Sequence, residues 1–177
     1  LEVLKDAIPK LARVVFLQTP VAGIGRDLQL KEIRAAAQAL KLNLEEIDTQ
    51  PDAKGLESAF KTAKQKQVGA ITTLAARPFF AERKRIVELA VKYRLPTIYP
   101  EKEFVNEGGL MSYGADLADS YRRVAYFVDR ILKGAKPADL PVERPSVFKL
   151  VVNKATADTL GITLPTTVLL RADEVIE

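Results

Sequence analysis

The chain has 177 residues, of which 47% are hydrophobic and 28% are charged, so its composition is that of a globular protein with one good core. The formal net charge of +4 comes from 27 basic and 23 acidic residues that are interspersed. Nucleic-acid surfaces concentrate basic residues with aromatic residues between them, so we expect no nucleic-acid partner. Cysteine and histidine are both absent, which excludes a disulfide framework, a thiolate metal site and a histidine base. We therefore expect no metal and no cofactor.

Apolar periodicity alternates between strand and helix over the first two thirds of the chain. The pattern predicts strands at 13–17, 42–47, 70–74, 96–99 and 109–113. It predicts helices at 28–40, 56–65 and 78–93. Strands that alternate with helices form right-handed βαβ crossovers, so we predict an α/β fold with a doubly wound parallel five-stranded sheet. The expected strand order is 2-1-3-4-5, as in a flavodoxin-like lobe, with ligands at the carboxyl ends of the strands.

The last third of the chain breaks this alternation. A helix is predicted over 117–132 and is closed by Gly134, and three prolines between residues 137 and 145 then favour a stiff extended path. A strand at 147–152, a short helix at 154–160 and an extended piece at 166–170 follow. A self-contained five-stranded domain does not need this tail, whereas a chain that crosses between two lobes does.

Several polar and aromatic side chains follow the predicted strands and are candidates for ligand contact. Gln18 and Thr19 end the first strand, where they either hydrogen-bond a ligand or only cap the turn. Arg77 begins a helix, where its guanidinium either holds a ligand carboxylate or is a solvated rim charge. Phe79 is a candidate wall of the cleft, with core packing as the alternative, and Tyr99 ends the fourth strand.

Ser112 and Tyr113, at the end of the fifth strand, are the preferred pair for ligand contact, although Tyr113 as a packing residue is the alternative. A hydrolase of flavodoxin-like fold with Ser112 as nucleophile is the enzyme alternative. Leu110-Met-Ser-Tyr-Gly114 lacks the first glycine of the nucleophile elbow, and the chain has no histidine for a triad. We therefore expect a protein that is not an enzyme.

Five segments carry a family resemblance that spans nearly the whole chain. They are Leu1–Pro9, Glu103–Gly114, Ile131–Pro141, Leu160–Pro165 and Leu169–Val175. In order and spacing they resemble the C-terminal portion of the substrate-binding proteins of bacterial ABC transporters, some of which are described as tryptophan or tyrosine receptors. The chain departs from relatives at Gln18-Thr19, where an asparagine-proline pair is usual, and at Arg77, where many relatives have an acidic residue.

The resemblance implies one lobe of a type I periplasmic-binding-protein fold. Residues 1–11 would end a missing N-terminal lobe, and residues 12–114 would form the α/β ligand-binding lobe. Residues 115–145 would be a crossover helix and hinge that belong with the missing lobe, and residues 146–177 a strand-helix segment that packs on the present one.

The function implied by the resemblance is the solute-binding component of an ABC importer. An amino acid, or an aromatic or other small carboxylate, would bind in the cleft between the lobes, and a membrane permease would be the partner. Such receptors are periplasmic or lipid-anchored outside the cytoplasm; the sequence begins at Leu1 and shows no signal segment. Without the other lobe, residues 1–11 and the helix with Val124, Phe127, Val128 and Ile131 would expose apolar faces, which favours a homodimer through these crossover elements.

Overall fold

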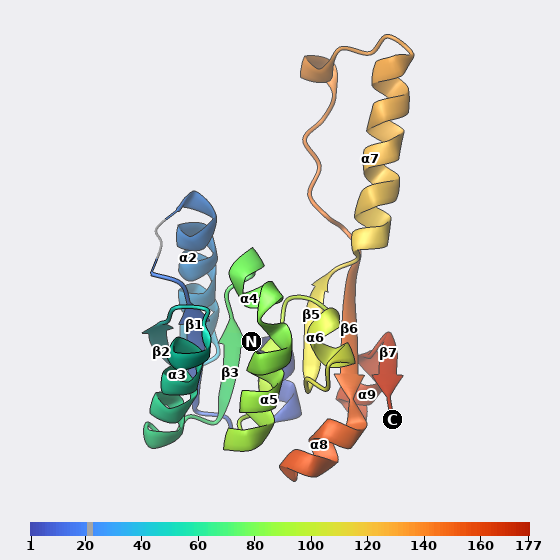
Figure 1. Ribbon diagram of the computed structural model, residues 1–177. Coiled ribbons are helices and arrows are strands. Elements are labelled where there is room, and N and C mark those ends of the chain that lie inside the picture. The colour runs from blue at the N-terminus through green and yellow to red at the C-terminus, as the bar shows by residue number, and fades with distance from the viewer. Residues whose placement is uncertain (21–22) are drawn as a thin grey trace.

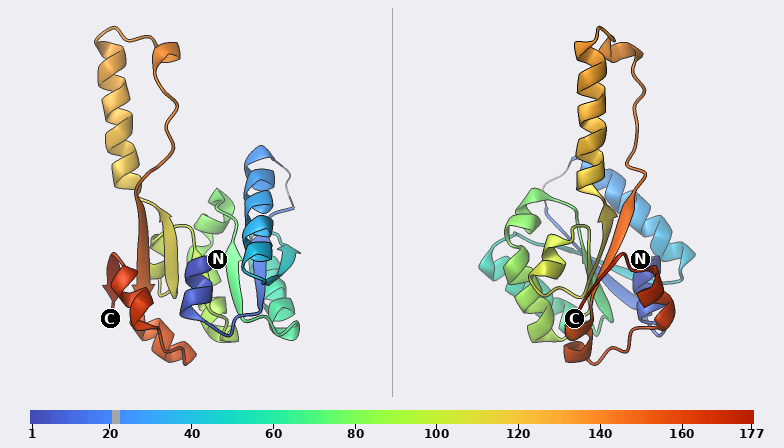
Figure 2. Two further views of the ribbon diagram at one scale, coloured as in Figure 1. Left: turned by 180° about the vertical axis from the view of Figure 1, so that it is seen from behind. Right: turned by 90° about the vertical axis from the view of Figure 1, so that its right-hand side faces the viewer.

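The computed structural model describes residues 1–20 and 23–177 and has two parts (Figure 1). One part is an α/β lobe built on a single sheet. The other is an extension, made of one long helix and a returning segment, that stands away from the sheet in every view (Figures 1 and 2). No helix within these described residues has both the length and the apolar composition of a membrane span.

The sheet has seven strands in the order β2-β1-β3-β4-β5-β6-β7. The strands are β1 (Arg13–Gln18), β2 (Asn43–Asp48), β3 (Ala70–Thr73), β4 (Thr97–Tyr99), β5 (Met111–Ala115), β6 (Phe148–Asn153) and β7 (Glu174–Ile176). The pairs among β1 to β5 are all parallel, which confirms the predicted order 2-1-3-4-5. β6 adds antiparallel to β5, and β7 adds parallel to β6. The sheet is therefore larger than the predicted one, and β7 was not predicted.

Helices cover both faces of this sheet (Figure 2). They are α1 (Glu2–Ala7), α2 (Ile24–Ala39), α3 (Ala53–Gln65), α4 (Arg77–Ala81), α5 (Arg83–Tyr93), α6 (Glu103–Asn106), α8 (Lys154–Leu160) and α9 (Thr166–Arg171). On one face, Phe60 of α3 and Ile86 of α5 pack on Val15 and Ile71. On the other, Leu4 of α1 and Val168 of α9 share a core with Val14, Ala70 and Ile98. The strands that are buried on both faces explain the near-continuous apolar runs in the sequence.

The first helix belongs to this lobe. Val3, Leu4, Ala7 and Leu11 are all buried, and they pack in the same core as β1, β3 and β4. The prediction that residues 1–11 lose their packing surface without another lobe is therefore wrong. Their amphipathic pattern matches the sheet below them, and burial of these apolar side chains contributes to this core.

Two further predictions are corrected. The helix predicted over 78–93 is two helices, because the chain turns at Glu82, between α4 and α5. This turn lets Phe79 enter the core while α5 runs along the sheet. The piece predicted to be extended at 166–170 is the helix α9, in which Val168 is buried against the second core. Thr166 and Thr167 have low helix propensity, but tertiary packing decides the conformation.

The extension consists of α7 (Leu117–Leu132), the short 3-10 helix η1 (Pro137–Asp139) and an extended return to β6. No residue of α7 is buried. One face of α7 carries an apolar stripe with alternating spacings of four and three residues, namely Leu117, Tyr121, Val124, Val128 and Ile131. All five are exposed, Tyr121 by 72%. A helix with such a stripe normally buries it against another element.

Candidate functional site

A pocket of about 430 Å³ lies at the carboxyl ends of three adjacent strands. Ala75 borders it after β3, Pro100 and Glu101 after β4, and Ser112 and Gly114 to Asp116 at the end of β5. Lys149 and Val151 of β6 and the first residues of α6 and α7 complete the wall. The pocket therefore opens where a doubly wound sheet normally binds its ligand, beside the base of the α7 extension.

Close backbone packing shapes one side of this pocket. A Cβ atom on Gly114 would lie 1.9 Å from the carbonyl oxygen of Pro100 and 3.0 Å from its carbonyl carbon. Only glycine fits this close approach between the end of β5 and the loop after β4. Gly114 thus brings the two loops that border the pocket together.

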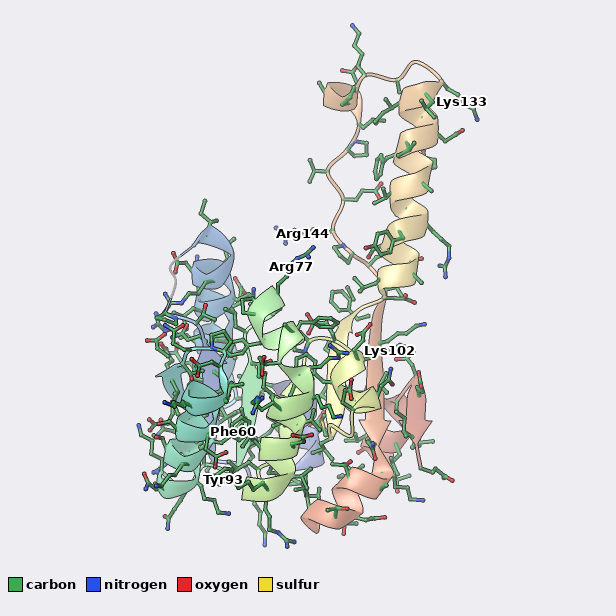
Figure 3. All side chains as sticks on the ribbon, in the orientation of Figure 1. Phe60, Arg77, Tyr93, Lys102, Lys133 and Arg144 are labelled. Atoms are coloured by element: carbon green, nitrogen blue, oxygen red, sulfur yellow. The ribbon has the colours of Figure 1, made fainter. Side chains whose placement is uncertain are left out.

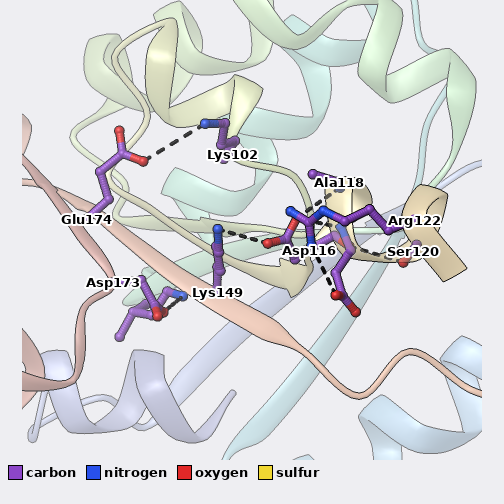
Figure 4. Close-up of polar contacts among 10 residues, drawn as sticks. Lys102, Asp116, Ala118, Ser120, Arg122, Lys149, Asp173 and Glu174 are labelled. Atoms are coloured by element: carbon purple, nitrogen blue, oxygen red, sulfur yellow. Dashed lines mark hydrogen bonds and ion pairs between the residues drawn. The ribbon is translucent and has the colours of Figure 1, made fainter.

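Asp116 joins the two chain segments that connect the lobe to the extension (Figure 4). Its carboxylate caps α7 by accepting the backbone N–H groups of Ala118 at 2.9 Å and Asp119 at 3.2 Å. The same carboxylate accepts Lys149 Nζ at 2.8 Å, and its backbone N–H donates to the carbonyl of Val147 at 2.9 Å. The hydrogen bond from Lys149, followed by the one from the Asp119 N–H, lowers the pKa of Asp116. The carboxylate is therefore ionised at neutral pH and ties β5 to β6 at the base of α7.

Glu101 is the unusual acid of the pocket. Burial raises the pKa of this carboxyl to about 7, and repulsion from Glu103 adds to the shift. Within the described part of the chain, the carboxylates of Glu101 and Glu103 form no ion pair and no hydrogen bond with a side chain. A half-buried acid that titrates near neutrality in a pocket is typical of a functional group.

Of the predicted contact residues, only Ser112 lies in this pocket. It is 2% exposed, and its hydroxyl makes no side-chain hydrogen bond within residues 1–20 and 23–177. Tyr113 points to the opposite face of the sheet, as alternation along a strand requires. Its ring is 48% exposed and stacks on Phe148 with 5.8 Å between ring centroids. The structure therefore separates the predicted pair.

Phe79 and Tyr99 are core residues, which corrects the prediction that they contact a ligand. Phe79 has no exposed surface and packs among the residues of α3 and α5. The Tyr99 ring stacks on Phe104 with 4.4 Å between centroids, and its hydroxyl accepts a hydrogen bond from Thr97 Oγ1 at 2.8 Å. Burial raises the pKa of Tyr99, so this hydroxyl stays neutral.

The other three predicted residues border the same edge of the sheet without lining the pocket. Gln18 and Thr19 are buried at the end of β1, where the Gln18 carbonyl accepts the Thr49 N–H at 2.8 Å. The Gln18 side-chain oxygen is buried and has no partner among the described residues. Arg77 is exposed at the start of α4, at the edge of the lobe from which the extension projects (Figure 3). Ligand contact by these three residues stays a prediction.

Sequence reasoning missed Glu101 and the Asp116–Lys149 pair as parts of the site. The segment after the fourth strand had a clear signal, since it lies at the carboxyl edge, but nothing in the sequence showed that Glu101 is half-buried. Lys149 reaches the pocket only because β6 pairs antiparallel to β5, with Gly114 opposite Lys149. Across the described residues, no group of three or more acids forms a candidate metal site.

The fold is an α/β lobe with a pocket at the carboxyl ends of its strands and an extension that projects beside the pocket. The model of the family "ABC transporter substrate binding protein" matches residues 1–176. The chain belongs to this family, whose members are substrate-binding proteins and not enzymes. No protein of curated function matches the sequence.

The solved structures that are similar to this chain include three that show the likeness over nearly its whole length. A conserved domain protein from Vibrio cholerae is 25% identical with a TM-score of 0.86, over 98% of this chain and 58% of that one. An ABC domain from Streptococcus pneumoniae in complex with L-Trp is 28% identical with a TM-score of 0.86, over 99% of this chain and 60% of that one. The open, ligand-free form of a substrate-binding protein with adhesive properties from Clostridium difficile shares the fold, at 16% identity and a TM-score of 0.75, over 99% of this chain and 58% of that one. The chain thus spans less than two thirds of each of them.

Proposed function

We propose that this chain is the C-terminal ligand-binding lobe, with the hinge elements, of a receptor that delivers a small molecule to an ABC permease. Its ligand would be an amino acid or an aromatic or other small carboxylate, bound outside the cytoplasm. The observation that carries this proposal is the pocket at the carboxyl ends of β3, β4 and β5, in a chain of the substrate-binding family. L-Trp in the Streptococcus pneumoniae relative supports an amino acid.

A second lobe would account for the extension. No part of the chain that the structure describes covers the apolar stripe on α7. The chain passes between lobe and extension twice, at β5–α7 and at the return into β6. We assign residues 115–145 to the hinge and to contact with the N-terminal lobe, and residues 146–177 to the present lobe. Closure of two lobes over a ligand at such a pair of crossings is a hinge motion, and the closed form would be the one a permease recognises.

The experiment needs the intact receptor, which in this proposal contains both lobes. A complex with a dissociation constant of about 1 μM has about −8 kcal/mol of binding free energy, and one lobe with half of it keeps only millimolar affinity. A thermal-shift screen of the intact receptor against amino acids and small carboxylates should find a ligand. Saturation at 100 times the dissociation constant adds about 2.7 kcal/mol to the free energy of unfolding.

A pair of matched variants tests the place of binding. Ala75 is exposed and borders the pocket, so Ala75→Trp should fill it without disturbing the core and should abolish the ligand-induced shift. Ser58 is equally exposed and borders a second, separate pocket beside α3, so Ser58→Trp should leave the shift unchanged. The proposed site is wrong if Ser58→Trp, and not Ala75→Trp, removes the response. A receptor that no member of the panel stabilises would contradict the proposed function itself.

A further inference from the structure

The lysines that border the 430 Å³ pocket have partners of opposite charge, whereas some of its acids have none among the described residues (Figure 4). Both lysines of the pocket have acidic partners: Lys149 Nζ lies 2.8 Å from Asp116, and Lys102 Nζ lies 3.9 Å from Glu174 of β7. Glu101 has no cationic partner in the described part of the chain. The pocket is therefore left with uncompensated negative charge on the side of the β4 loop.

A second, independent feature points to a ligand at the same place. Ser112 is 98% buried by its surroundings, yet its hydroxyl has no side-chain partner in residues 1–20 and 23–177 and faces the pocket that Glu101 borders. A hydroxyl that borders a pocket and has no side-chain partner is open to a hydrogen bond from a ligand that enters the pocket. A hydroxyl and a carboxylate together offer hydrogen-bond acceptors to a group that has several N–H donors.

We propose that Glu101, with Ser112, binds an ammonium group of the ligand, so that the receptor selects amine-bearing molecules over carboxylates that lack an amine. This inference rests on the proposed function and narrows its ligand class. An ammonium group has three donors and a full positive charge, and it replaces the water that an uncompensated carboxylate would otherwise need. The carboxylate of an amino acid would then face away from Glu101.

The charged groups around Glu101 set the pH dependence of this contact. Glu103 of α6 repels it, while Lys102, Asp116 at the start of α7, and Lys149 of β6 are engaged in the ion pairs described above. Because the pKa of Glu101 is raised to about 7, the free carboxyl is partly protonated at neutral pH. An ammonium ligand binds the ionised form, so binding should release a proton and should strengthen as the pH rises from 5 to 8.

The test uses matched ligand pairs on the intact receptor: each amino acid of the panel and the carboxylic acid that lacks only its amine, such as L-tryptophan and 3-indolepropionate. Calorimetry at pH 8 should show binding of at least one amine and at least tenfold weaker binding of its deaminated partner. Glu101→Gln should weaken the amine by about 10- to 100-fold and abolish the pH dependence. Calorimetry at pH 7 in two buffers of different ionisation enthalpy should show the proton release in the wild type only.

Glu107→Gln is the matched control. Glu107 follows α6, which Glu101 precedes, and it pairs with Arg83 at 3.2 Å without bordering the pocket. This variant should bind like the wild type. Equal binding of amine and deaminated partner, with Glu101→Gln unchanged, would overturn the ammonium contact and leave the receptor function standing. Binding by no member of either series would overturn both proposals.

Discussion

Gly114→Ala gives the sharpest structural test of how the pocket is built. The added Cβ would lie 1.9 Å from the Pro100 carbonyl oxygen and 3.0 Å from the carbonyl carbon. Both atoms belong to the backbone, so no side-chain rotation relieves the contact, and either β5 or the loop after β4 must shift. Overpacking of this kind costs about 1–3 kcal/mol. The lower chain entropy of alanine in the unfolded state returns about 0.4–1 kcal/mol of this cost.

We therefore expect Gly114→Ala to lower the free energy of unfolding by about 1–2 kcal/mol, measured by urea denaturation followed by circular dichroism. Gly25→Ala is the control, because a Cβ at Gly25 meets no atom of residues 1–20 and 23–177 within 4 Å and the residue lies in α2. The control should be as stable as the wild type or up to about 1 kcal/mol more stable. A Gly114→Ala variant as stable as the Gly25→Ala variant would refute the close approach of β5 to the β4 loop.

Three more predictions concern charge and exposure. The raised pKa of Glu101 means that the folded state binds more protons than the unfolded state between about pH 4.5 and 7, so wild-type stability falls as the pH rises through this window. Because the group is only half-buried, Glu101→Gln should raise the free energy of unfolding by about 1–2 kcal/mol at pH 8 and leave it unchanged at pH 4. Equal urea midpoints of the variant and the wild type at pH 8 would contradict this. Asp116→Ala removes the cap of α7, so amide exchange in the first turn of α7 should be several times faster than in the wild type. Asp116→Asn keeps the cap, so its exchange rates there should be close to those of the wild type. Finally, the 177-residue chain should self-associate through the exposed stripe of α7. Replacing Tyr121 and Val128 by glutamate should reduce the mass measured by light scattering. A wild-type chain that is monomeric and binds no dye specific for exposed apolar surface would show that the stripe does not drive association.

The sheet was predictable because burial on both faces leaves a plain signal in the sequence. The run 13–17 is polar only at Arg13, and the run 70–74 only at its two threonines. The edge strand β2 is mostly polar, and none of its six residues is fully buried. The break at Glu82 and the helix α9 could not be predicted, since each depends on a contact with a distant element, through Phe79 and Val168 respectively.

The site was less predictable than the fold. Position at a strand end led to Ser112, which borders the pocket, although its contact with a ligand stays a prediction. The direction of a side chain depends on register, and this places Tyr113 on the other face and Tyr99 in the core. Glu101 was missed because an acid after a strand resembles any solvated loop residue until its burial is known. The family resemblance supplied the class of protein, which periodicity alone does not contain.

The most direct measurement of the central claim is hydrogen–deuterium exchange of the intact receptor with and without the small molecule that stabilises it most. If the ligand binds at the carboxyl ends of β3, β4 and β5, protection should appear in the segments 75–77, 101–103 and 112–118, each of which contains residues that border the pocket. Protection confined to residues 47–62, around the second pocket, or no protection in this lobe at all, would contradict the account.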